Sequence, residues 1–269
     1  MNCAKFGMAA LGLSIVGIST AVAAGSPPPA GYFTMQLTPG TTYEDVFSRT
    51  FSIKGQGFQE IVKRQSGSAA YTVVDTDPDR PVFQLTYRYD GIAPGSGQAQ
   101  IRDRGRIACF DGKCQVDAET SGLAFDPVLW GEPPPDPAPG TTWRIRINQP
   151  WELGPPGNET IHVVSVDPAN AVIMLDREGH GSGQSDSEDL HTVAMTVGKT
   201  TVDAKIVAGA SHWSGQTVFC HGIILSDVLL LERPVTLVTK LGTFKGVERA
   251  YTLLNAMPTE TATGHPRDS

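Results

Sequence analysis

The chain has 269 residues, with 28 acidic against 21 basic side chains and a formal net charge of −7. This excess of acid argues against nucleic acid as a partner, because affinity for phosphate comes mainly from lysine and arginine. The length allows two small domains or one large β domain. The 29 glycines and 20 prolines fall at short intervals and argue against long helices.

The first 24 residues have the pattern of a secretory signal peptide. Lys5 precedes an apolar stretch over 6–18, which is too short to cross a bilayer as a helix. Small residues at 21–24 suit cleavage near Ala23 or Ala24. The alternative is an N-terminal membrane anchor. We expect a periplasmic or secreted chain with no transmembrane segment after signal cleavage.

Five short blocks of sequence recur in the same order along the chain. Residues 39–43 (PGTTY) return at 139–143 (PGTTW). The other blocks are VVxxDP at 73–78 and 163–168, GSGQ at 95–98 and 181–184, GKxxVDA at 112–118 and 198–204, and VLxxExP at 128–134 and 228–234. Because the order is kept, the blocks predict a duplicated module of about 100 residues, a size typical of small domains.

Short segments rich in β-branched and aromatic residues alternate with turn residues. Residues 83–89 and 143–147 alternate apolar and polar side chains, which is typical of a strand with one face on a core. The predicted strands are 71–75, 82–89, 143–147, 160–166, 171–175, 192–197, 202–207, 217–225, 235–240 and 249–254. So many short strands predict an antiparallel sandwich or barrel-like fold.

We therefore expect an all-β fold of two tandem duplicated antiparallel β modules, of sandwich or half-barrel type. The first module covers 30–132 and the second covers 140–257, with the C-terminal strand closing the second. The Pro-rich stretch 133–139 is expected to be a stiff linker, and 258–269 a disordered tail. The repeat does not decide whether the modules share one sheet or form two domains.

The cysteines predict one disulfide and one free thiol. Cys109 and Cys114 flank Asp111-Gly112, a strong two-residue hairpin turn, and two cysteines across such a turn can reach disulfide geometry. An exported chain also meets an oxidising compartment. Cys220 is left over, either as a small buried apolar residue or as a reactive or intermolecularly paired thiol.

The second copy carries extra residues between 204 and 222. We expect these residues to lengthen a hairpin whose tip carries Ser211, His212 and Trp213, with His221 on one arm. Aromatic side chains on projecting loops are common in recognition surfaces, so this tip is the predicted binding site. The alternative is that Trp213 folds back into the core of its own module.

Catalytic and metal-binding motifs are weak. His212, His221 and Cys220 are of metal-ligand type, but their spacing matches no zinc motif. The acidic run 185–189 is better explained as a solvated loop than as a calcium site. We therefore predict no metal, no cofactor and no catalytic residue. The alternative for nucleophilic catalysis is a Ser211–His212 pair completed by a distant carboxylate, because a triad is defined by its geometry and not by the order of its residues.

The Gly-Thr-aromatic start of a strand at 40–43 and 140–143, the signal peptide and the all-β layout are similar to exported bacterial proteins of unknown function. They also resemble the half-barrel folds of periplasmic lipoprotein carriers. That resemblance implies a concave apolar face that holds a lipid or docks a partner. We predict an exported, non-enzymatic binding or cell-envelope interaction protein, with an unknown apolar ligand or envelope protein as its partner. The alternative is a secreted hydrolase with an unrecognised active site.

Overall fold

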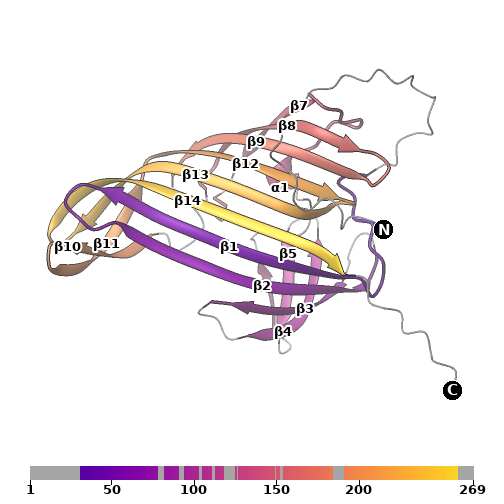
Figure 1. The fold of residues 1–269 in the computed structure, drawn as a ribbon, viewed down its shortest axis with the longest axis horizontal. Coiled ribbons are helices and arrows are strands. Elements are labelled where there is room, and N and C mark those ends of the chain that lie inside the picture. The colour runs from indigo at the N-terminus through magenta and orange to yellow at the C-terminus, as the bar shows by residue number, and fades with distance from the viewer. Residues whose placement is uncertain are drawn as a thin grey trace, which may run out of the picture.

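The protein is built almost entirely from β-strands that share one sheet (Figure 1). The computed structural model describes residues 31–77, 82–90, 94–102, 105–110, 113–117, 125, 127–148, 150–151, 154–183 and 191–259. Every strand pair within these residues is antiparallel. The prediction of an all-β antiparallel fold is confirmed. The predicted signal peptide lies outside the described residues.

Fourteen strands and one helical turn make up the described part of the chain. The strands of the first half are β1 (Thr42–Gly55), β2 (Ile61–Asp75), β3 (Val82–Tyr89), β4 (Gly95–Arg102), β5 (Gly105–Phe110) and β6 (Lys113–Asp117). Helix α1 (Pro127–Trp130) follows. The strands of the second half are β7 (Thr142–Ile147), β8 (Gly157–Asp167), β9 (Val172–Ser182), β10 (Thr192–Val197), β11 (Thr200–Ala208), β12 (Ala210–Cys220), β13 (Ile223–Thr239) and β14 (Gly242–Thr259).

The last strand joins the two halves of the chain. The main path through the sheet is β6-β5-β4-β3-β2-β1-β14-β13-β12-β9-β8-β7, and β10 and β11 lie off this path. Strand β14 pairs along its length with β1 on one side and with β13 on the other. Figure 1 shows these three long strands running side by side. The two halves therefore share one continuous sheet, a point that the repeat could not decide.

Strict alternation of side chains defines the two faces of the sheet. On β13 the buried positions are every second residue from Leu229 to Leu237, and Leu230, Glu232 and Pro234 between them are exposed. Because successive strand residues point to opposite faces, one face carries the core and is here called the inner face. The opposite, solvent-facing side is called the outer face.

The sheet curls so that distant strands cover each other's inner faces. Phe51 and Ile53 of β1 share one core cluster with Met195 of β10 and Ile206 of β11. The amide of Gln59 donates a hydrogen bond to the carbonyl oxygen of Thr196 at 2.9 Å in the same region. A second cluster joins residues of β2 and β3 to β13, and a third lies under β7, β8, β9 and β12. The core is thus built by one sheet folded over itself.

Two of the recurring blocks adopt matching local structures. The amides of Gly40 and Gly140 donate to the carbonyl oxygens of Val73 and Val163, each at 2.9 Å. Both glycines have positive φ, 81° and 90°, which glycine adopts without steric cost. The ladders next to them each shift register once, between Val73 and Asp75 and between Val163 and Ser165. These parallels support the predicted duplication, which stays a prediction.

The predicted hairpin of the second copy is wrong. Strands β11 and β12 do not pair with each other in the described residues; both lie along the same side of β13. Lys205 to Ala208 face residues 238–235, and His212 to Cys220 face residues 232–223. The added residues therefore extend one strand instead of forming a tip, because β13 offers an edge long enough for both.

Strand bounds and the set of strands also differ from the sequence prediction. The predicted strand 217–225 is divided by a turn at His221 and Gly222, where φ is 50° and 73°. Strand β14 continues to Thr259, which faces Thr42 of β1, so the first two residues of the predicted tail are part of the sheet. Strand β1 was not predicted, because its inner-face positions include Asp45 and Arg49 and break the apolar alternation.

Helix α1 is four residues long. Within the residues that the structure describes, no helix has both the length and the apolar character needed to cross a membrane.

Candidate functional site

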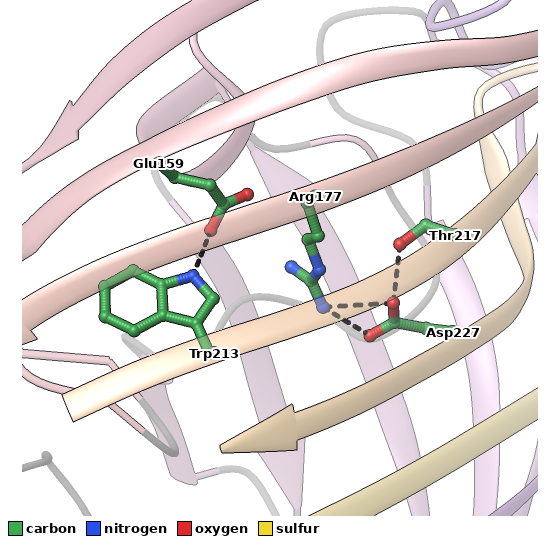
Figure 2. Close-up of polar contacts among 5 residues, drawn as sticks. All are labelled: Glu159, Arg177, Trp213, Thr217 and Asp227. Carbon is green, nitrogen blue, oxygen red and sulfur yellow. Dashed lines mark hydrogen bonds and ion pairs between the residues drawn. The ribbon is translucent and has the colours of Figure 1, made fainter. Parts of the chain in front are cut away.

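Trp213 lies in the interior and is bonded to a buried carboxyl group. Its indole nitrogen donates a hydrogen bond to Oε2 of Glu159 at 2.6 Å (Figure 2). The Trp213 side chain is fully buried and Glu159 is 2% exposed. Trp151 packs edge-on against the indole, with ring centroids 5.4 Å apart. Trp213 therefore lies in the core of its own half of the chain, as the alternative prediction stated.

Two glycines make the space that the indole fills. Gly179 of β9 stands between Trp213 and Glu159 in the register of the sheet. A Cβ atom at Gly179 would lie 2.1 Å from Cε2 of Trp213, and one at Gly157 would lie 2.7 Å from its Cη2. Real Cβ atoms do not approach so closely, so both positions need glycine for the indole to reach across β9 to the carboxyl group on β8.

A second polar group lies beside the first on the inner face. Nη2 of Arg177 donates to both carboxylate oxygens of Asp227, at 3.0 and 2.9 Å, and Thr217 donates to the same carboxylate at 2.6 Å (Figure 2). The guanidinium carbon of Arg177 lies 4.8 Å from the centre of the Trp130 ring. Gly215 is the register partner of Arg177 and leaves room for its guanidinium group. A Cβ atom at position 215 would lie 3.2 Å from Nε of Arg177.

An ion pair between Arg233 and Glu248 is the most deeply buried charged contact in the described part of the chain. Nε of Arg233 donates to Oε1 of Glu248 at 2.9 Å, and both side chains are 0% exposed. Ser211 is also buried. Within the residues that the structure describes, its Oγ and the second carboxylate oxygen of Glu248, Oε2, have no hydrogen-bond partner. Such burial is costly unless each charge is paired, so this contact holds β13 and β14 in one register.

Burial shifts the acid-base behaviour of these groups. Desolvation raises the pKa of Glu159 above its ordinary value of 4.5, against the opposing effects of the nearby Arg177 charge and the Trp213 hydrogen bond. Desolvation likewise raises the pKa of Glu248, although Arg233 acts in the opposite direction. Burial lowers the pKa of His221. Both carboxyl groups therefore hold their protons to higher pH than free glutamate does.

The chemistry available to this polar interior is limited by its geometry. A carboxyl group with a raised pKa is of the kind that general acid catalysis uses. The described neighbours of Glu159 are an indole and a guanidinium, and no described serine, cysteine or histidine is bonded to it. The carboxylates of Asp227 and Glu248 are likewise held by arginines. The arginine and indole contacts stabilise the inner face, and the hydroxyl bonded to these carboxylates is that of Thr217, which donates to Asp227.

The residues of the predicted tip do not converge. Ser211 is buried on the inner face, whereas His212 is exposed on the outer face, 3.6 Å from Glu178. Because neighbours on a strand point to opposite faces, Ser211 and His212 do not form a catalytic pair with each other. His221 lies at the turn after β12, away from both. No group of three or more metal-ligand side chains occurs in the described residues.

The cysteine predictions have different outcomes. Cys220 is disulfide-bonded, so the prediction of a free thiol is wrong. It is buried against Val172 at the end of β12. Cys109 and Cys114 are register partners on β5 and β6, as a hairpin disulfide requires. Their side chains lie outside the described part, so the Cys109–Cys114 bond stays a prediction.

Sequence reasoning missed the inner-face charged residues in the second half of the chain. They are Glu159, Arg177, Asp227, Arg233 and Glu248. One signal was present: Arg233 shares the alternation of the leucines and valines around it on β13. A charged residue in phase with apolar neighbours predicts a buried charge. Its partner Glu248 is 15 residues away and could be found only from the register of the sheet.

Comparisons with known proteins give no family. No family model and no curated protein matches the chain. A COG4313 outer membrane channel from Pseudomonas putida F1 is 6% identical and superposes with a TM-score of 0.22, covering 87% of this chain and 100% of its own. A DUF3598-family protein of unknown function from Nostoc punctiforme is 10% identical with a TM-score of 0.16, covering 77% and 94%. At these TM-scores neither likeness carries an argument.

Truncation of the buried indole is expected to destabilise the fold. Trp213→Ala should lower the free energy of unfolding by about 3–5 kcal/mol, because it removes a fully buried ring. Urea unfolding measures this change. His212→Ala is the control on the outer face and should change the free energy by less than about 0.5 kcal/mol. Equal small effects from both variants would contradict the placement of Trp213 in the core.

Breaking the buried ion pair is expected to cost more than replacing it. Glu248→Ala should destabilise the protein by about 3–5 kcal/mol, because it leaves the Arg233 charge buried alone. The double variant Arg233→Met with Glu248→Leu should recover most of that loss. Neutralising the exposed pair Arg249–Glu232 is the control and should cost about 0–1 kcal/mol. A double variant no more stable than Glu248→Ala would contradict this account.

The buried Glu159 should make stability fall as pH rises. The folded protein holds the Glu159 proton more tightly than the unfolded chain does, because its folded pKa is raised above 4.5. Its stabilising contribution is therefore complete below pH 4.5 and declines as pH rises through the folded pKa. Glu159→Gln should make this decline shallower in urea unfolding between pH 4 and 8, the remainder coming from Glu248, whereas outer-face Glu44→Gln should leave it unchanged. A wild-type advantage that grows with pH would reject the assignment.

Proposed function

We propose that this chain is an exported, non-enzymatic binding protein whose inner face holds an amphipathic, negatively charged ligand. The main observation behind this proposal is that the alternation of buried and exposed residues is interrupted on β2. Ile61 and Ala69 are buried on the inner face, yet Lys63 and Gln65 between them are exposed although they share the same phase. This part of the inner face, over β1 to β3, is called the inner strip.

The inner strip combines aromatic and cationic side chains. Phe47 of β1 and Tyr87 of β3 are half-buried there, facing Gly67 and Ala69 of β2. The guanidinium carbon of Arg49 lies 5.1 Å from the centre of the Phe47 ring. Rings supply contact for an apolar group, and a lysine beside them favours an acidic one. This composition supports a ligand with an apolar body and a negatively charged head.

A non-enzymatic role is supported by how the charges of the interior are used. The inner-face carboxyl groups Glu159, Asp227 and Glu248 are each bonded to a neighbouring indole or arginine in the described structure. An active site would instead need titratable groups converging on a reacting atom. The inner strip offers contact surface and charge, which are the requirements of binding.

A fluorescent probe tests the inner strip. We expect anilinonaphthalene sulfonate, an apolar ring system with one negative charge, to bind the folded protein, and Lys63→Glu to weaken binding about tenfold or more, as reversal of a contacting charge does. Lys205→Glu, an exposed lysine on the outer face of β11, is the matched control and should bind as wild type does. Native mass spectrometry of protein taken from its own compartment should show additional non-covalent mass. Equal probe affinity in both variants would reject the inner strip.

A further inference from the structure

The free edge of β7 points to a second interaction surface, separate from the inner strip. Strand β7 is the last strand on its side of the sheet, and in the described residues it pairs with β8 alone. An unpaired strand edge presents backbone amides and carbonyls that can pair with another chain. We infer that this edge binds an extended acidic segment of a partner protein as an added strand.

The register shows which backbone groups face the free edge. The amide of Val163 donates to the carbonyl oxygen of Thr141 at 2.9 Å, one step beyond the partners Thr142 and His162. Bonded and non-bonded partners alternate along an antiparallel ladder. The backbone groups of Arg144 and Arg146 therefore point away from β8, toward the position that an added strand would occupy.

Strand β7 pairs regularly with β8, and its inner-face side chains are fixed by contacts with the core. The pairing of β7 with β8 runs without a register shift from Thr142 to Ile147, and the strand contains no proline. On the inner face, the indole nitrogen of Trp143 donates to the carbonyl oxygen of Trp130 at 2.8 Å, and Ile147 is buried. Prolines and bulges block edge pairing in many sheets, and β7 has neither; its protection is the charge of Arg144 and Arg146, which opposes a like-charged strand and leaves the edge open to an acidic one.

The charge of the edge selects the kind of partner. Arg144 and Arg146 are exposed on the outer face, and neither forms a hydrogen bond or ion pair within the described structure. Their partners on β8, Thr160 and Asn158, are uncharged. A second copy paired edge to edge would bring these arginines together, so charge opposes self-association. Acidic residues at alternate positions of an added strand would instead lie beside the two guanidinium groups.

A pair of peptides tests the inference. The probe is a fluorescein-labelled hexapeptide of alternating glutamate and valine, and its counterpart carries lysine in place of glutamate. Fluorescence anisotropy at low salt should show that the glutamate peptide binds, and that it binds about tenfold or more tightly than the lysine peptide. The double variant Arg144→Gln with Arg146→Gln should lose this preference. Arg64→Gln, which removes an exposed arginine of β2, should keep it.

Amide exchange separates strand addition from simple charge attraction. With the glutamate peptide bound, exchange at the amides of Arg144 and Arg146 should slow, while that at Ile145, which already faces β8, should not change. Binding without this alternate protection, equal affinity for both peptides, or no binding at all would overturn the inference. A dimer that protects the same two amides without peptide would overturn it in favour of a second copy of this chain.

Discussion

The need of one sheet to cover its own apolar face governs this structure. A sheet that is hydrophobic on one side must bury that side against another layer. The described residues contain a single helical turn, so strands distant on the path supply that layer. β10 and β11 cover the end of β1 and the start of β2, and the start of β13 packs with β2 and β3. Strand β14 pairs with β1 on one side and with β13 on the other, so the curled sheet is continuous.

Curling also explains the charges in the interior. Strands such as β13 and β14 are long enough to pass from one core cluster to the next, and Arg233 and Glu248 lie between apolar residues of different clusters. Arg233 and Glu248 are tolerated there because each strand supplies the partner of the other's charge at hydrogen-bond distance. Glycines at 179 and 215 give the indole and guanidinium groups their room. Polar pairing and small residues thus act together to keep one register.

The errors of the sequence prediction have a common physical origin. The extra residues of the second copy suggest a longer hairpin in the sequence. The comparison of the two copies gives only the number of added residues, and it does not say which strand they pair with. β13 provided that partner, and Trp213 became a core residue. β1 was missed because Asp45 and Arg49 occupy core-facing positions, and a periodicity of apolar residues cannot recognise a charge that will be buried. The inner-face charges were missed for the same reason.

The sequence by itself determined the strand-rich class, the alternation that separates inner from outer faces, and the recurring strand starts at 40–43 and 140–143. These features depend on neighbours within a few residues, so they can be recognised without the fold. Only the tertiary structure decided that β14 joins both halves, that Trp213 meets Glu159, and that β7 ends the sheet. Those contacts join residues far apart in the chain, and a ladder can form in any register that buries the same face until the whole sheet selects one.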